Sequence, residues 1–533
     1  MKNLTKYFAL SLVAGLTLSA CNDLDTEPWG EVITEDQNAD VVAKDPSMLE
    51  ATISGLYANI NAWESAYADM FDFGYPAIMI QLESRTEDFV TIDPGAYGWF
   101  ANCVAFTDNT STSPYNTCRW RVPYNVIYAS NNVVALVDKE ATDNTLRFYR
   151  GQALGTRAFG YWILAQLYQF NYVGHQQDPC VPLITDENQQ DAAINGAPRA
   201  TVEEIYTQII NDLTEGITLM DGNPMTRPDK RYIDINVLRA LRARTYLCMQ
   251  KYAEAAADAQ AVINSGRFTP LSADQAALPG FITLSDANWV WGINISEEDV
   301  HGLYTFAGMM GSYTYGYAYA GMWKCINQNL FARIPSGDVR RGWWIDPDGN
   351  SNASIYMPDG QATEYLESVG APTYAVTKFR PYGDVLSQSN NPADVPLIRI
   401  EEMYLILAEA QGLGENISTG KATLEKFVND YRWKGNVAYT CAATTTEEFI
   451  NEIWFQRRIE LWGEGLNYFD VMRLKKPIDR SNSNFNNANN NAQYAYKIPA
   501  ESAVMLSLIP QAEINGNPAI TDADQNPTGQ ASL

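Results

Sequence analysis

The stretch that decides the fold is residues 236–266, NVLRALRARTYLCMQKYAEAAADAQAVINSG, which has the pattern of two helices joined by a short break. The break falls near Gln250 and Lys251. Four small side chains in the second half permit a close approach to a neighbouring helix, namely Ala253, Ala256, Ala257 and Ala261. Gly266 is placed to end that helix, because glycine readily adopts the left-handed conformation that follows a helix C-terminus. The stretch therefore predicts a helical hairpin.

Bulky and small positions interlock in this hairpin in a way that is similar to a tetratricopeptide repeat. The positions in register are Ala240, Ala243, Tyr246, Leu247, Tyr252 and Ala256. One such unit cannot bury its own apolar face, so the neighbouring helices should stack on it. A plain helical hairpin is the alternative interpretation of the same residues.

Helical patterns precede the hairpin. Residues 146–170 have the periodicity of a long buried helix. Residues 201–220 follow, where Thr201 can cap a helix and Glu204, three residues on, completes a capping box. The chain upstream of the hairpin is therefore also predicted to be helical.

After the hairpin the composition changes. Residues 271–395 are rich in glycine, proline, asparagine and aromatic residues, which is typical of a loop-rich region. Helical patterns resume at 395–412, with Gly412 as the stop, and at 446–474, with Thr446 as the cap. The predicted fold class is mostly α, a tetratricopeptide-like helical repeat body with a loop-rich, aromatic-rich flank.

These patterns divide the chain. The predicted parts are a signal peptide (1–20), an N-terminal tether (21–45), a helical region with tetratricopeptide-like repeats (46–270), a loop-rich aromatic region (271–395) and a C-terminal helical region with a tail (396–533).

The N-terminus has the pattern of an export signal. Lys2 and Lys6 precede the apolar residues 8–18, which are too few to cross a bilayer as a helix. The tetrapeptide LSAC at 18–21 resembles the bacterial lipobox, so Cys21 is expected to carry lipid and hold the protein at a membrane surface without spanning it. An ordinary secretory signal with Cys21 as a stray thiol is the alternative.

Acidic residues follow the cysteine directly. Asp23, Asp25 and Glu27 resemble the tether that directs some Gram-negative lipoproteins to the outer face of the outer membrane. A solvated linker is the alternative interpretation of these three residues.

The net charge excludes some partners. The formal charge is −26, and such a surface repels nucleic acid and anionic lipid head groups. Besides Cys21 the chain has six cysteines, scattered rather than paired, so they suggest neither a disulfide scaffold nor a zinc site. A disulfide between Cys103 and Cys118 is possible but not deducible from the sequence.

Several charged residues fall within otherwise apolar helical patterns. Glu401, Glu402 and Glu409 would need buried partners, and the arginines of the 446–474 stretch are available. Within that stretch, Arg457 precedes Glu460 by three residues and Asp470 precedes Arg473 by three, spacings that allow pairing along a helix. We interpret these charges as structural rather than ligand-binding.

The order of motifs along the chain resembles the SusD/RagB family of outer-membrane nutrient-binding lipoproteins. The resemblance begins with CNDLDTEP and ATISGLYANI, and continues with GQALGTRAFGYWILAQLYQFNYVG, VPLI at 181 and the hairpin. It ends with LIRIEEMYLILAEA, RRIELWGEGLNYFDVMRL and LIPQAEINGNPAI. It covers about two thirds of the chain and is weakest at 271–395 and 481–493.

The resemblance implies a mostly helical body with irregular loops built onto one side. It implies a binding protein rather than an enzyme, which captures a glycan outside the cell and delivers it to a SusC-like TonB-dependent transporter. Attachment to the outer membrane would be through the lipid alone. Some relatives look like peptide or glycopeptide binders, so a peptide or glycopeptide ligand is the alternative interpretation.

Aromatic residues mark the candidate glycan-binding surface, because an aromatic face stacks on a sugar while phenol and indole hydrogens bond hydroxyl groups. In the loop-rich region these are Trp289, Trp291, Tyr313, Tyr315, Trp323 and Trp343, and we expect them to form one exposed arc with Trp99. An extended segment would place Tyr313, Tyr315, Tyr317 and Tyr319 on one face. By the resemblance, Arg85, Tyr97 and Trp99 are further candidates. Serving as a core for the loops is the alternative for each ring.

Signals for catalysis, metals and cofactors are weak. The chain has only two histidines, His175 and His301, and no familiar hydrolase or nucleotide-binding motif. The segment from Asp346 begins like a calcium loop, but Ser351 and Met357 stand where glycine and glutamate are needed. No catalytic residue, metal or cofactor is therefore expected. An all-helical glycoside hydrolase and a scaffold that binds only protein are the alternatives from other classes.

Overall fold

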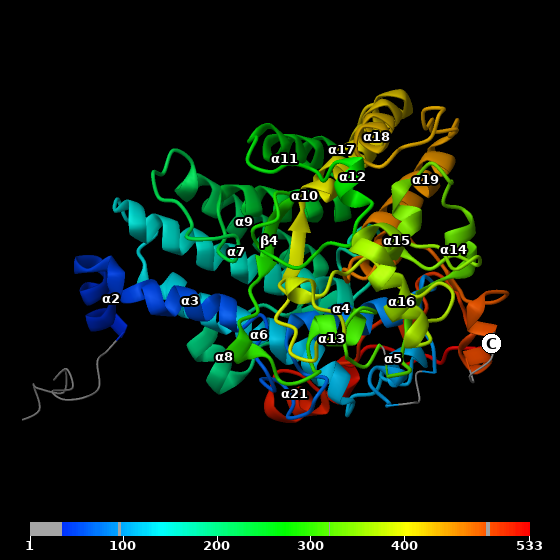
Figure 1. The fold of residues 1–533 in the computed structure, drawn as a ribbon. Coiled ribbons are helices and arrows are strands. Elements are labelled where there is room, and N and C mark those ends of the chain that lie inside the picture. The colour runs from blue at the N-terminus through cyan, green and yellow to red at the C-terminus, as the bar shows by residue number, and fades with distance from the viewer. Residues whose placement is uncertain (1–34, 94–96, 319, 487–490, 533) are drawn as a thin grey trace, which may run out of the picture.

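The computed structural model describes residues 35–93, 97–318, 320–486 and 491–532 (Figure 1). The expected lipobox with Cys21, the acidic tether and Tyr319 lie outside the described residues. The longer helices are α2 (Glu35–Lys44), α3 (Glu50–Ala58), α4 (Tyr75–Ser84), α6 (Pro114–Leu136), α7 (Asn144–Leu167), α9 (Val202–Met220), α10 (Ile235–Cys248), α11 (Tyr252–Asn264), α17 (Ile400–Gly414), α18 (Ile417–Tyr431) and α19 (Thr446–Glu460).

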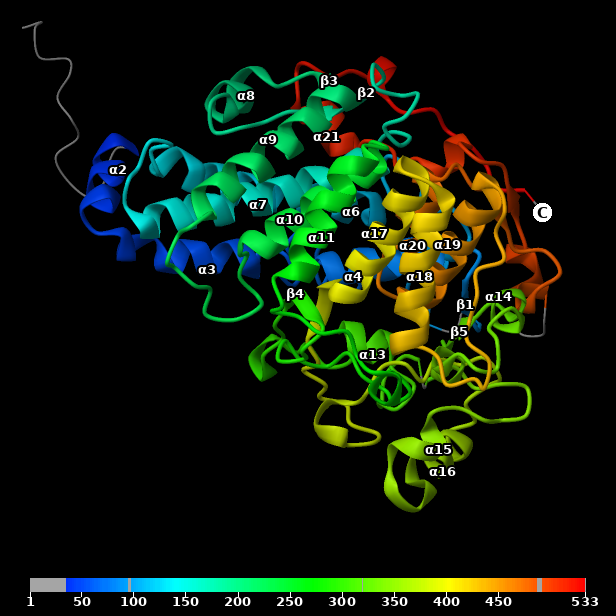
Figure 2. The same ribbon diagram turned by 90° about the horizontal axis from the view of Figure 1, so that it is seen from above.

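These helices pack against one another in chain order, α6 on α7, α7 on α9, α9 on α10 and α10 on α11. The stack then continues from α11 to α17, which carries α18 and α19 on its other sides (Figure 2). The residues between α11 and α17 therefore leave the stack and return to it. The mostly α fold class is confirmed, while the repeat character of individual helix pairs stays a prediction.

Several helix ends lie where the capping residues and glycines of the sequence predict them. Thr201 caps α9, and its side chain and that of Glu204 form the predicted capping box. The hairpin breaks after α10, where Gln250 has a φ of 56°, and Gly266 follows α11 with a φ of 64°. The predicted hairpin at 236–266 is confirmed.

Three predicted boundaries are wrong. Residues 395–399 form strand β6 (Val395–Arg399) rather than the start of a helix. Gly412 does not end α17, because the helix continues to Gly414; a Cβ at Gly412 would lie 1.9 Å from Cε1 of Phe449. Gly412 is thus needed for the close approach of α19, whose cap is Thr445 rather than Thr446.

Within the part of the chain that the structure describes, the strands form four two-stranded antiparallel sheets. The strands besides β6 are β1 (Phe89–Thr91), β2 (Pro179–Pro182), β3 (Arg199–Thr201), β4 (Trp289–Ile293), β5 (Lys324–Ile326), β7 (Ile478–Asp479) and β8 (Lys497–Ile498). In the longest pair, Trp289 of β4 lies opposite Arg399 of β6, and Ile293 lies opposite Val395. This pair ties the loop-rich region to the start of α17.

Short helices interrupt the irregular segments. They are α5 (Ala101–Val104), α8 (Gln189–Asn195), α12 (Ala273–Ala276), α13 (Phe306–Met310), α14 (Gln328–Ala332), α15 (Ala353–Tyr356), α16 (Gln361–Ser368), α20 (Asn467–Arg473) and α21 (Gln511–Gly516). The loop-rich region has a small core of its own, separate from the main one, to which Tyr313, Trp323 and Leu366 contribute. Figure 2 shows α15 and α16 projecting from the helical body on this side.

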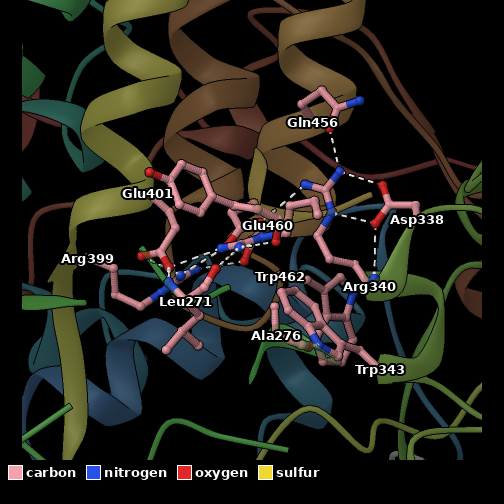
Figure 3. Close-up of polar contacts among 12 residues, drawn as sticks. Leu271, Ala276, Asp338, Arg340, Trp343, Arg399, Glu401, Gln456, Glu460 and Trp462 are labelled. Carbon is pink, nitrogen blue, oxygen red and sulfur yellow. Dashed lines mark hydrogen bonds and ion pairs between the residues drawn. The ribbon is translucent and has the colours of Figure 1, made fainter. Parts of the chain in front are cut away.

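A buried ion network joins the loop-rich region to the C-terminal helices. Its members are Asp338, Arg340, Lys378, Arg399, Glu401, Arg432, Glu460 and Glu464. Glu460 lies at its centre and accepts hydrogen bonds from Arg340 at 3.2 Å, Arg399 at 3.0 Å and Arg432 at 2.8 Å (Figure 3). The four cations and four carboxylates balance, which a buried ionic cluster requires.

The prediction that the helix carboxylates are structural is confirmed. Glu402 pairs with Arg244 at 2.5 Å and Glu409 pairs with Arg473 at 2.5 Å, all of them buried. Asp470 pairs with Arg473 as its spacing predicts. The predicted pairing of Arg457 with Glu460 is wrong, because Arg457 pairs with Asp470 instead and Glu460 belongs to the network.

The six cysteines of the described residues are all buried and free, so the possible Cys103–Cys118 disulfide is not formed. Among the described helices, none combines the length and the apolar character that a membrane span requires.

Candidate functional site

Two tryptophans expected in the exposed arc belong to the main core. Trp289 and Trp291 lie on β4 and are fully buried, because β4 is covered by β6 on one edge and by helices on its face. The Trp291 ring packs edge-on against Phe159 with centroids 4.9 Å apart, and its indole N–H donates to the carbonyl of Arg231 at 2.8 Å. Neither ring offers a surface to a ligand in this structure.

Three more of the expected arc residues are also buried. Tyr313 and Trp323 help to build the core of the loop-rich region, and the Tyr313 hydroxyl donates to Asn352 at 3.1 Å. Trp343 is 1% exposed, and its indole N–H donates to the carbonyl of Ala276 at 2.6 Å. The expected arc of exposed rings is therefore wrong for these residues. Tyr313 and Trp323 build the core of the loop-rich region, and Trp343 belongs to the main core.

Arg85 is likewise a buried structural residue. Its guanidinium pairs with Asp108 at 2.6 Å and donates to the carbonyl of Val504 at 2.6 Å. It also lies over the Phe106 ring, 4.6 Å from the centroid. With 1% of its surface exposed, Arg85 is not accessible to a glycan.

The tyrosine-rich segment 313–318 is a series of turns rather than an extended strand. Tyr315 is 45% exposed, whereas Tyr313 and Tyr317 are buried. The expectation that these tyrosines share one face is therefore wrong for the three that the structure describes.

Tyr97 and Trp99 lie where the sequence suggests, in a partly exposed group of aromatic side chains. Tyr97 is 49% exposed and Trp99 is half-buried. We call the group the ring cluster; its members are Trp63, Tyr97, Trp99, His301, Tyr304 and Tyr317. They come from three parts of the chain that are far apart in the sequence, around residues 63, 97–99 and 301–317.

The rings of the cluster contact one another in a continuous series. Trp63 stacks on His301 with centroids 4.3 Å apart and lies 5.8 Å from Tyr304. Trp99 packs edge-on against both Tyr304 and Tyr317 at 5.7 Å, and Tyr304 stacks on Tyr317 at 5.4 Å. Because each ring is supported by others, the cluster presents a rigid aromatic surface.

Local structure around α13 positions two of these rings. Thr305 caps α13 by accepting a hydrogen bond from the backbone of Gly308, which fixes Tyr304 just before the helix. The backbone N–H of Tyr317 donates to the carbonyl of Gly308 at 2.9 Å. A Cβ at Gly316 would lie 2.2 Å from that carbonyl oxygen, so glycine is needed there for Tyr317 to reach the cluster.

A cavity of about 470 Å³ adjoins the ring cluster. It lies between α3, the 60–63 turn, the end of β4 and the 299–301 turn, and Trp63 and His301 belong to both the cavity and the cluster. Its polar lining includes Asn61, Asn294 and Asp299. This volume is within the range of small-molecule binding sites.

The chemistry of the site is that of binding through rings and hydroxyl groups. Burial raises the pKa of the Tyr317 phenol, so its hydroxyl stays protonated and can donate a hydrogen bond. Aromatic faces beside amide and hydroxyl groups suit a sugar, which has both apolar C–H faces and hydroxyl edges.

Within the described residues no cluster of three or more potential metal ligands is found. The Asp346 segment forms turns instead: the Asp346 carboxylate accepts hydrogen bonds from the backbones of Asp348 and Asn350.

Sequence reasoning missed Trp63, His301 and Tyr304 as members of the site. Trp63 is one aromatic residue in a turn after α3, and only folding brings it to His301. For Tyr304 the sequence offers one weak signal: it directly precedes Thr305, which caps α13, so its position relative to that helix is fixed. Spacing along the chain could not have shown that the three rings meet.

Comparisons with known families place two segments of the chain. Residues 328–528 match the profile described as the SusD family. Residues 79–247 match one described as starch-binding, associating with outer membrane. Together the two matches cover more than half of the chain. No curated protein sequence matches it.

Solved structures share the whole fold. A SusD-like carbohydrate binding protein from Bacteroides vulgatus is 21% identical, with a TM-score of 0.72 over 91% of this chain and 98% of its own. A SusD superfamily protein from Bacteroides thetaiotaomicron is also 21% identical, with a TM-score of 0.68 over 93% of this chain and all of its own. One from Bacteroides fragilis is 19% identical, with a TM-score of 0.66 over 89% and 98%.

Proposed function

Because the chain belongs to the SusD/RagB family, we propose that it binds an oligosaccharide or polysaccharide at the ring cluster and delivers it to a SusC-like TonB-dependent transporter. The description of the second matched family, starch-binding and associating with outer membrane, supports both the ligand class and the location. The carbohydrate-binding description of the Bacteroides vulgatus relative points the same way.

The observation that carries the proposal is the ring cluster itself. Its exposed rings, Tyr97 and His301, stand beside the half-buried Trp63, Trp99 and Tyr304 and next to a polar cavity. A sugar ring can stack on the aromatic faces while its hydroxyl groups reach the amide and carboxylate groups of the cavity. The protein binds its ligand without chemical change in this proposal.

Attachment to the membrane completes the proposed role. Lipid on Cys21 would hold the helical body at the outer membrane, facing the extracellular side, without a spanning segment. The captured glycan would then pass from this protein to the partner transporter.

Replacing Trp99 with alanine tests the site. We expect the dissociation constant for the bound glycan to rise about tenfold, or about 1.4 kcal/mol, because a supported aromatic contact is lost. The measurement is isothermal titration calorimetry with amylopectin, xylan, mannan, arabinan and levan, followed by chromatography of the ligand for shortened products.

The control is Tyr382→Ala, which removes an exposed tyrosine outside the ring cluster and should leave affinity unchanged. Unchanged affinity of the Trp99→Ala variant for a glycan that the wild type binds would contradict the site. Shortened oligosaccharides after incubation would contradict the non-catalytic role, and binding of peptides but no glycan would contradict the ligand class.

A further inference from the structure

A second cavity, of about 420 Å³, lies on the other side of the helical body from the ring cluster. We call it the α6 groove; it is formed by the middle of α6, Ile184 and the start of α21. Figure 2 shows α21 and α13 on opposite sides of the helices, so the α6 groove and the ring cluster are separate.

Three aromatic side chains four residues apart line one face of α6 in this groove. They are Trp120, Tyr124 and Tyr128, and residues at this spacing lie one above the other on a helix. Trp120 is the buried end of the row, with its ring 4.9 Å from that of Tyr124. Tyr128 is the open end and is 63% exposed, an unusual position for a tyrosine that only supports the fold.

Polar side chains flank the aromatic row. Arg121 and Asn125 each follow one of the rings along α6, and Glu513 of α21 also lines the groove. Arg121 uses one nitrogen to bind the carbonyl of Ala66 at 2.9 Å. The side-chain amide of Asn125 makes no hydrogen bond to any residue that the structure describes, so it is available to a ligand.

The groove is preformed. The Tyr124 hydroxyl donates to the carbonyl of Pro182 at 2.8 Å, and the Asn131 amide donates to the carbonyl of Ile184 at 3.1 Å. On the other side, the backbone of Gln511 donates to the carbonyl of Ser111 at 2.8 Å, which holds α21 near α6. A ligand would therefore meet a groove whose walls and Tyr124 ring are already held in place, which lowers the entropic cost of binding.

From this geometry we infer that the α6 groove is a second carbohydrate site, which takes a short neutral saccharide stacked on Tyr128 and Tyr124. A row of rings flanked by amide, guanidinium and carboxylate groups offers the mixed apolar and hydrogen-bonding surface that a sugar needs. Arg121 and Glu513 offset one another, and the chain carries a charge of −26, so an anionic ligand is disfavoured.

The size of the groove argues for a small ligand rather than a protein. Its volume is near the lower end of the range for small-molecule sites, whereas a stable protein interface buries about 800 Å² on each partner. The site would add a second point of contact with a polysaccharide, and two linked contacts raise overall affinity without new interactions at either one.

The test uses the protein with the ring cluster weakened by Trp99→Ala, so that the α6 groove accounts for a larger share of the binding, and crystals show which site each probe occupies. The probes are maltotriose, cellotriose, mannotriose and xylotriose, measured by saturation-transfer NMR and by crystals soaked in each. We expect one trisaccharide to occupy the groove over Tyr128. Adding Tyr128→Ala should weaken its binding about tenfold, while Tyr382→Ala in its place should not, and all variants should keep the melting temperature of Trp99→Ala.

The outcomes separate the two sites. Loss of all trisaccharide binding in the Trp99→Ala variant, or binding that is insensitive to Tyr128→Ala, would overturn the second site and leave the ring cluster intact. Wild-type affinity in Trp99→Ala together with loss in Tyr128→Ala would support the α6 groove and overturn the ring cluster. Trisaccharide density at neither site in the wild type would overturn the groove as a saccharide site.

Discussion

Replacing Glu460 with glutamine is expected to lower the free energy of unfolding by about 3–5 kcal/mol, the usual cost of removing one partner from a buried ionic cluster. The carboxylate accepts hydrogen bonds from Arg340, Arg399 and Arg432, each of which is at most 1% exposed at its side chain. Without it, four buried cations face three carboxylates. Denaturant unfolding followed by tryptophan fluorescence measures the loss.

A surface glutamate of the same helix provides the matched control. Glu447 is exposed in the first turn of α19, where its charge interacts with the helix dipole and with Lys476. Glu447→Gln should cost no more than about 1 kcal/mol. A loss for Glu460→Gln as small as that of the control would show that the network contributes little to stability.

The pH dependence of stability gives a second readout of the same network. Burial would raise the pKa of Glu460, but the guanidinium groups of Arg432, Arg399 and Arg340 hold it well below the ordinary value. The carboxylate therefore contributes its stability above the pKa of the unfolded chain, about 4.3, and loses it as the pH falls through the lower pKa of the folded state. Stability of the wild type should fall in that acidic range, and that of Glu460→Gln should fall less.

The helical frame could be predicted because its signals are local. The box of Thr201 and Glu204, the break at Gln250 and the stop at Gly266 each depend on residues within one turn of a helix. The boundary errors have a different origin. Gly412 lies inside its helix, where glycine leaves room for Phe449 of another helix, and no pattern around residue 412 contains that information.

The candidate site could be predicted only in part, because exposure of a ring is decided by pairing between distant segments. Trp289 and Trp291 are buried because β4 pairs with β6, which follows the whole loop-rich region. Composition identified the aromatic residues of that region correctly but could not separate those that form its core from those that face outward. Tyr97 and Trp99 remain in the site, joined by Trp63 from a segment without any motif.

The buried charged residues could also be predicted only in part. A carboxylate on an apolar helix face predicts a buried partner, and Glu402 and Glu409 do find one. For Glu402 the expected stretch supplies only the more distant partner, Arg457 at 3.8 Å, whereas the closer partner, Arg244 at 2.5 Å, lies on α10. The sequence thus predicts that a buried carboxylate has a cationic partner, whereas the packing of the helices decides which residue that partner is.

Replacing Gly420 with alanine is expected to lower the free energy of unfolding by about 3 kcal/mol, the upper end of the usual cost of overpacking. A Cβ at Gly420 would lie 2.5 Å from the carbonyl oxygen of Ala408 and 2.5 Å from Cα of Gly412. Both atoms are backbone atoms of α17, so no side chain can turn aside and α17 and α18 must separate. Denaturant unfolding of the two proteins measures the difference.

The same substitution at Gly55 should have the opposite sign, because this glycine lies within α3 and a Cβ there would have no atom within 4 Å. Alanine favours a helix over glycine by up to about 1 kcal/mol, so Gly55→Ala should stabilise the protein. Gly420→Ala also tests whether the frame and the site are separable. At a temperature where Gly420→Ala is folded, its glycan affinity should equal that of the wild type, because α18 contributes no residue to the ring cluster. A loss of affinity in proportion to the loss of stability would mean that the packing of α17 on α18 helps to hold the rings in place.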